Sequence, residues 1–361
     1  MQQDLENNVS QKRIYAMKKG LLLLSTAVVA MSASAQSLVT KVNAPTPLSE
    51  PHSTANKAMA GTKMAEEDNA PEVEDDSRIF NPQGEQKLYS MSFTMNDDGG
   101  AYSYSSDKMH VCFDNDGKTV YFKDFVRPYN DWDRSGNEAW VKGTINGDKI
   151  TIPGHQMIWR CDTTAYYLEG VGRGDDGMVR LDQFELKINA DGSITYLIDD
   201  NSTYMGVYEP GVGFWAFSWD YTLKPVTDTP VSLPEGLQTT KNVLKFTDSY
   251  DGEVMRFVYT AQEGDDFYIS GLAPSTKTDW VKGKINGDKV EIPSWQLLAS
   301  DDYTLYTLAA ADLVRYDDYG NPIFEPSDMI EFTVTEKGTV LTLTPSNKYL
   351  LELYYDRTGY T

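Results

Sequence analysis

The sequence predicts an all-β protein built from two tandem antiparallel β-meander domains, and three observations support this prediction. Residues 140–153 (WVKGTINGDKITIP) and 280–293 (WVKGKINGDKVEIP) are identical at eleven of fourteen positions, which indicates an internal repeat. Short runs alternate apolar with polar residues, the period of a half-buried strand. Asp-Gly and Asn-Gly pairs separate these runs, as in tight hairpins. Nearly every link is short, which favours a barrel-like closure, with a β-sandwich as the alternative.

Residues 1–35 are expected to lie outside the fold. A basic segment begins at Met17, residues 20–31 form a short apolar run, and small residues at 33–35 supply a cleavage pattern. This is the organisation of a secretory signal peptide behind an upstream extension. The apolar run is too short to span a bilayer. We therefore expect an exported chain that is periplasmic, extracellular or associated with the cell surface.

The rest of the chain divides by composition. Residues 36–81 are rich in Ala, Pro, Ser, Thr and acidic residues, which is typical of a disordered acidic linker. Two β domains are predicted to follow, at residues 82–226 and 232–361. The aromatic run at 213–221 in the first copy has no counterpart near the end of the second. The second copy is thus expected to lack its last strand.

Within each copy the alternation predicts which side chains are buried. Two matching sets lie on one face of a strand: Phe184, Leu186 and Ile188 in the first copy, and Ile330, Phe332 and Val334 in the second. In the repeated hairpin, a two-residue turn at Asn146-Gly147 places Ile145 opposite Asp148 and, in the second copy, Lys282 opposite Glu291. The predicted apolar face then consists of Val141, Gly143, Ile145, Ile150 and Ile152.

The tryptophan that starts each repeated hairpin has two interpretations. Strict alternation places Trp140 and Trp280 on the polar face, where they could form an aromatic platform for a sugar ring or an apolar ligand. Alternatively, each tryptophan folds over the end of the barrel and seals it.

The loop at 126–139 is the main difference between the copies, because it is seven residues longer than its counterpart. It contains aromatic and acidic residues that suit carbohydrate recognition: Tyr129, Asp131, Trp132 and Asp133. Asp131, Asp133 and Ser135 also follow the opening of a calcium loop, although Lys142 stands where the bidentate Glu belongs. Ca²⁺ is thus the one cofactor that the sequence indicates, and a solvated polar turn is the alternative.

Composition restricts the function further. A net charge of −22 disfavours a nucleic-acid partner. Neither a G-x-S-x-G nor an H-E-x-x-H motif occurs, and the second copy has no histidine where the first has His110 and His155. No catalytic residue is therefore assigned, and a hydrolase is kept as the weaker alternative. Cys112 and Cys161 form either a disulfide or two free thiols.

The hairpin pattern W-V-K-G-x-I-N-G-D-K is followed in both copies by I-P-x-x-Q, ending at Gln156 and Gln296. This pattern resembles secreted β-rich tandem-repeat proteins of unknown function from Bacteroidota. The resemblance covers the chain from about Pro82 onward and implies exported β-rich repeats, but no activity or site residues. We expect a secreted, non-catalytic binding or surface-interaction protein whose partner is a glycan, a small ligand or another surface protein. A structural or adhesive spacer at the cell surface is the alternative.

Overall fold

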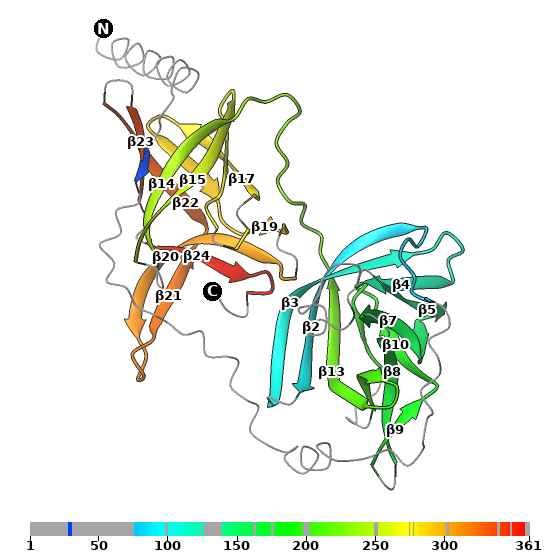
Figure 1. Cartoon of the computed structure of the whole chain (residues 1–361). Coiled ribbons are helices and arrows are strands. Elements are labelled where there is room, and N and C mark those ends of the chain that lie inside the picture. The colour runs from blue at the N-terminus through cyan, green and yellow to red at the C-terminus, as the bar shows by residue number, and fades with distance from the viewer. Residues whose placement is uncertain are drawn as a thin grey trace. The chain divides into compact units, whose positions relative to one another are not determined.

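The computed structural model describes residues 28–30, 76–97, 100–123, 125, 139–161, 164–174, 177–197, 203–248, 252–273, 275–276, 278–300, 303–337, 340–346 and 349–357. All regular structure in these residues is β, which confirms the predicted class (Figure 1). The chain divides into two compact units. The first unit is Ala44–Thr227, and the second is Asp228–Thr361 together with Met1–Asn43.

The first unit contains a closed ring of antiparallel strands, which confirms the barrel-like prediction. The ring consists of β2 (Glu85–Asp97), β3 (Gly100–Phe113), β4 (Thr119–Lys123), β5 (Trp140–Asn146), β6 (Lys149–Pro153), β10 (Gln183–Ile188), β11 (Ile194–Tyr196) and β13 (Gly213–Pro225). Strand β13 closes the ring because it pairs with both β2 and β11. A closed ring leaves no strand edge unpaired along its joined length.

The meander is interrupted after β6, where the chain leaves the ring and returns only at β10. The intervening strands are β7 (Gln156–Cys161), β8 (Thr164–Gly174) and β9 (Gly177–Leu181). Strand β12 (Thr203–Glu209) pairs with β8 on one side and with β13 on the other. These strands therefore join the ring in one 12-stranded sheet. The expectation that nearly every link is short does not hold between β6 and β10.

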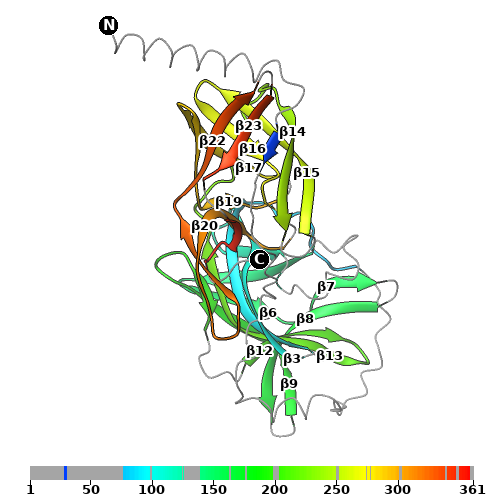
Figure 2. The ribbon, with the colours of Figure 1, turned by 90° about the vertical axis from the view of Figure 1, so that its left-hand side faces the viewer.

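The second unit repeats this order of pairing, with one difference. Its closed barrel contains β14 (Thr240–Asp248), β15 (Gly252–Glu263), β16 (Asp266–Ser270), β17 (Trp280–Asn286), β18 (Lys289–Pro293), β22 (Met329–Lys337) and β23 (Val340–Pro345). The remaining barrel strand is β1 (Val28–Ala30), which pairs in parallel with β14 and β23 (Figure 2). A separate 4-stranded sheet contains β19 (Gln296–Leu298), β20 (Tyr306–Tyr316), β21 (Pro322–Ser327) and β24 (Tyr349–Tyr354).

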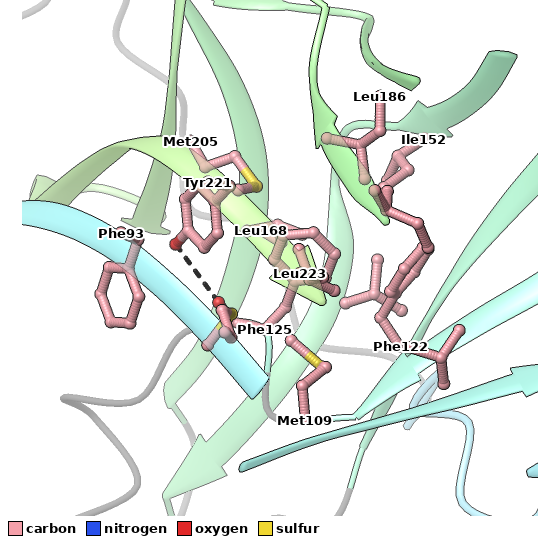
Figure 3. Packing of buried hydrophobic residues seen from close by; sticks show 14 of the residues in the cluster. Phe93, Met109, Phe122, Phe125, Ile152, Leu168, Leu186, Met205, Tyr221 and Leu223 are labelled. Atoms are coloured by element: carbon pink, nitrogen blue, oxygen red, sulfur yellow. Dashed lines mark hydrogen bonds between the residues drawn. The ribbon is translucent and has the colours of Figure 1, made fainter. Parts of the chain in front are cut away.

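Apolar side chains occupy the interior of each barrel. The predicted alternation on β10 is confirmed, since Phe184 and Leu186 are buried, and β22 repeats it with Ile330 and Phe332. Figure 3 shows the core of the first unit, where rings and aliphatic side chains from many strands pack together. In that core the hydroxyl of Tyr221 donates a hydrogen bond of 3.3 Å to the main-chain oxygen of Phe125. A ring of eight strands is just wide enough for side chains to fill its interior.

The repeated hairpin has the predicted faces but a different register. Ile145 pairs with Ile150, and Asn146 pairs with Lys149, so the prediction that Ile145 lies opposite Asp148 is wrong. The turn residues are Gly147 and Asp148, and of these two only Gly147 has a positive φ, of 66°. A glycine of positive φ at the first central position is typical of a type II′ turn. The pairing moves by two residues, and side chains of period two keep their faces.

Candidate functional site

The structure places part of the predicted binding site. Trp140 and Trp280 lie on described strands. The loop residues Tyr129, Asp131, Trp132, Asp133 and Ser135 lie outside the described residues, so the predicted carbohydrate and calcium sites stay predictions. Among the residues that are described, no group of three or more His, Cys, Asp and Glu side chains is placed to hold a metal ion.

Trp140 does not form an exposed platform, because its side chain is part of the buried interior. Only 6% of Trp140 is exposed. Its amide donates a hydrogen bond of 2.7 Å to the main-chain oxygen of Ile79, and the two residues form an isolated β-bridge. Trp280 is partly exposed and forms the corresponding bridge with Val231. In both units, the chain segment that precedes the barrel is thus fastened at the start of the repeated hairpin. This position favours the sealing role over the platform.

A glutamine three residues beyond the hairpin completes the hydrogen bonding of the hairpin in both units. The side-chain Oε1 of Gln156 accepts a hydrogen bond of 2.7 Å from the amide of Lys142, and its Nε2 donates to the main-chain oxygens of Lys142 and Pro153. Gln296 makes the same three contacts with Lys282 and Pro293. The glutamine amide therefore stands in for a strand partner, which gives the repeated I-P-x-x-Q pattern a structural explanation.

The repeated glycine of the hairpin also has a structural role, but its surroundings differ between the units. A Cβ atom at Gly143 would lie 2.8 Å from the side chain of Ile150. A Cβ atom at Gly283 would lie 2.4 Å from the main-chain oxygen of Glu291. Both glycines thus permit a close approach of β6 to β5, or of β18 to β17.

Lys282 forms an ion pair different from the predicted one. Its Nζ lies 2.7 Å from Oδ2 of Asp266 on the neighbouring strand β16, while Glu291 lies opposite Lys284. The prediction of a Lys282–Glu291 pair is wrong because it used the same shifted register as the first hairpin. The hydrogen bond with Lys282 lowers the pKa of Asp266, and the same contact raises the pKa of Lys282. Both groups are partly exposed to solvent, so the pair adds little to stability.

A polar cluster on the first unit, which the sequence did not indicate, centres on the buried carboxylate of Glu169 in β8. Its Oε1 lies 2.7 Å from Nδ1 of His155, and its Oε2 accepts a hydrogen bond of 2.8 Å from the His155 amide. Nη1 of Arg180 lies 3.9 Å from the same Oε1. The His155 ring stacks on Tyr167, with 4.2 Å between ring centroids. We call these four residues the Glu169 cluster.

The first role that the geometry gives to the Glu169 cluster is structural: it supports the backbone at His155. His155 has a φ of 58°, which is uncommon for a residue with a side chain. A buried carboxylate needs hydrogen bonds, and His155 supplies two of them. An exposed imidazole oriented by a carboxylate is also the arrangement of a general base. The second unit has Trp295 at the same corner, with a φ of 69°, held instead by a hydrogen bond from its amide to the main-chain oxygen of Leu308.

Cys112 is buried on β3 as a free thiol, which agrees with the second of the two predicted alternatives for this residue. Burial raises the pKa of this thiol, so the neutral form is favoured. The side chain of Cys161 lies outside the described residues. No helix in the described part of the chain is long and apolar enough to cross a membrane.

Comparisons with known proteins give no assignment. No family model matches the chain. No curated protein matches it either. Among solved structures, a chain from the complex of Pseudomonas aeruginosa MucA and MucB is similar to 61% of this chain and 86% of that chain, at 11% identity and a TM-score of 0.12. This TM-score is too low to indicate a shared fold.

Proposed function

We propose that the chain is an exported, non-catalytic protein that acts through contacts of its surface, with its two β units as packed scaffolds. The observation that carries this proposal is the filled interior of the barrels. Phe122 and Ile152 in the first unit, and Ile292 and Phe332 in the second, have no exposed surface. Barrels that carry small ligands inside keep an internal cavity, whereas side chains occupy the space here. A partner is therefore expected on the outside.

Export is supported by the signal-like pattern that ends at Ala35 and by the acidic linker after it. The resemblance to secreted repeat proteins of Bacteroidota agrees with export. The expected destinations are the periplasm, the cell surface and the medium. Glycans and other surface proteins are the binding partners expected there. A net charge of −22 adds solubility and disfavours binding to nucleic acid.

Export is tested by expressing the full chain in a bacterium and determining the N-terminal sequence of the recovered protein. The expected product begins at Gln36 and is found outside the cytoplasm. A product that keeps residues 17–35 and stays in the cytoplasm would refute this part of the proposal.

Glycan recognition by the 126–139 loop is the more specific form of the proposal. Tyr129 and Trp132 would stack on sugar rings, while Asp131 and Asp133 would accept hydrogen bonds from hydroxyl groups. The burial of Trp140 favours this loop over Trp140 as the place where an aromatic ring meets a partner.

A glycan array tests this form of the proposal. The change Trp132→Ala is expected to abolish binding, while Tyr319→Ala, at a 92% exposed tyrosine of the second unit, serves as the matched control and should leave binding unchanged. If both variants bind like the unchanged chain, or if no glycan binds, the loop is not a glycan site. The structural spacer would then be the better description of the protein.

A further inference from the structure

The second unit is closed by a strand from outside its own repeat. In the first unit, β13 pairs antiparallel with β2 and with β11. In the second unit, the corresponding place between β14 and β23 holds β1. Figures 1 and 2 show β1, in blue, beside β14 and β23.

The pairing registers show that the closing-strand positions of the two barrels correspond residue by residue. Leu223 of β13 lies between Met91 of β2 and Ile194 of β11. Val29 of β1 lies between Leu244 of β14 and Leu343 of β23.

In each ring, the paired residues can be followed from strand to strand, starting at the repeated hairpin, and they lead to equivalent positions beside the closing strand. Ile194 pairs with Ile188, and Leu343 pairs with Val334, which are the third predicted core positions of β10 and β22. On the other side, Met91 and Leu244 occupy matching rungs of the first hairpin of each repeat. Val29 thus occupies in the second barrel the position that Leu223 occupies in the first.

The two closing strands fill this place to very different extents. Strand β13 has 13 residues, of which Tyr221 and Leu223 are buried in the core. Strand β1 has 3 residues and runs parallel to both of its neighbours, whereas β13 runs antiparallel to both of its own. The strand β14 beside it has 9 residues, and β23 has 6. Among the described residues, only β1 pairs with the facing edges of β14 and β23, so much of these edges is left for a longer strand. Such edges accept extended peptides through main-chain hydrogen bonds.

The occupant seen here also conflicts with the proposed export. Val28–Ala30 lies within the segment that the sequence predicts to be removed at Ala35. Removal would open the barrel between β14 and β23, beside the core residues Leu244 and Leu343. An exposed pair of strand edges next to an apolar core is strongly disfavoured. The exported chain thus requires another strand at this place.

We propose that the gap between β14 and β23 is a strand-acceptor site, and that in the exported chain it is filled by Leu38–Val42 of the same molecule. This proposal rests on the proposed export. The segment begins three residues after the predicted cleavage position. Its residues Val39, Thr40 and Val42 are β-branched and favour strands. Leu38, Thr40 and Val42 share one face, which gives the alternation that a barrel strand needs.

The remainder of the linker offers a poorer strand. Residues 43–75 are rich in Pro, Ala and acidic residues and contain few large apolar side chains, a composition that does not favour strand formation. The chain between Val42 and Asp76 can span roughly 110 Å when extended, so it does not prevent the segment from meeting its own second unit.

Hydrogen exchange on the purified chain that begins at Gln36 tests the proposal. In this chain the amides of β14 and β23 that face the gap are expected to be protected. The double change Thr40→Pro and Val42→Pro removes two main-chain donors from the segment. We expect exchange in 240–248 and 340–345 to become at least about tenfold faster, with β5 and β6 of the first unit unchanged. The matched control, Ser53→Pro with Ala55→Pro, lies in the same linker and should change nothing.

Two further measurements make the result decisive. A synthetic peptide of residues 36–43, added to the double-proline variant, is expected to restore protection, whereas a scrambled peptide is not. If exchange in β14 and β23 is the same with and without the prolines, the assignment of Leu38–Val42 is wrong. If protection is found only in a dimer, the strand comes from a second copy and the same-molecule proposal is overturned. Because this chain already begins at Gln36, a failure of export in cells leaves these results unaffected.

Discussion

The repeated glycine of the hairpin provides a prediction with an internal control, because the same substitution in the two units meets different atoms. In Gly143→Ala the new methyl group meets three side chains, of Ile150, Ile152 and Val120, at 2.8 to 3.3 Å. Side chains can shift, so an overpacking cost of about 1–3 kcal/mol is partly offset by the gain of roughly 0.5–1 kcal/mol expected when alanine replaces glycine in a strand. We expect Gly143→Ala to lower the free energy of unfolding by about 1 kcal/mol.

The same change at Gly283 is expected to cost more, since the new methyl group meets backbone. It would lie 2.4 Å from the oxygen and 2.9 Å from the carbonyl carbon of Glu291. Strand β18 must then move away from β17, which weakens the pairing of Lys284 with Glu291. The loss of a ladder hydrogen bond adds to the steric cost. We expect Gly283→Ala to destabilise its unit by roughly 2 kcal/mol more than Gly143→Ala does.

Native-state hydrogen exchange measures both costs in one chain, because peptides from β5 and β17 report separately. The unit without the substitution acts as the reference in each variant. Equal losses in the two units, or a larger loss for Gly143→Ala, would refute the reasoning from the backbone contact at Glu291.

Two further predictions concern the first unit. Gln156→Ala removes three side-chain hydrogen bonds to Lys142 and Pro153 and is expected to lower the free energy of unfolding by about 1–3 kcal/mol. Urea unfolding should show no such loss for Gln183→Ala, a control at an exposed residue. An equal loss in the two variants would contradict the role of the Gln156 amide as a strand partner. Burial raises the pKa of Tyr221 above 10.0, so its stabilisation is complete below pH 10 and falls above it, where only the unfolded chain ionises. In urea unfolding between pH 9 and 11.5, Tyr221→Phe should reduce the alkaline loss by up to about 1.4 kcal/mol per pH unit; an unchanged pH dependence would contradict this assignment.

The alternating pattern was enough to predict the β class, the barrel and the buried faces. Period-two side chains report which face is buried, and Phe184, Leu186 and Ile330 lie where this rule places them. The register was not predicted correctly. An Asn-Gly pair permits more than one turn type, and moving the pairing by two residues leaves every face unchanged, so Lys282 was matched with the wrong carboxylate.

The candidate site was harder to predict because its contacts join distant residues. Gln156 and Gln296 were visible as a repeated position, yet nothing in the pattern showed that the amide would replace a strand partner. Glu169 has alanine at the matching position of the second unit, and its contacts with His155 come from the fold alone. The position of Trp140 depends on Ile79, which lies far from it in the sequence.

The place of each closing strand in the sequence determines when its barrel can be completed. Strand β13 is the last strand of the first unit, but it pairs with β2, the first, joining Phe217 to Asn96 and Pro225 to Tyr89. Such a long-range pairing can form only after nearly the whole unit has emerged, which delays closure in a growing chain. In the second unit the closing strand, whether it is β1 or the segment Leu38–Val42 proposed for the exported chain, precedes every other strand of its barrel. The two units therefore differ in timing: one waits for its last strand to be made, and the other has its closing strand present from the start.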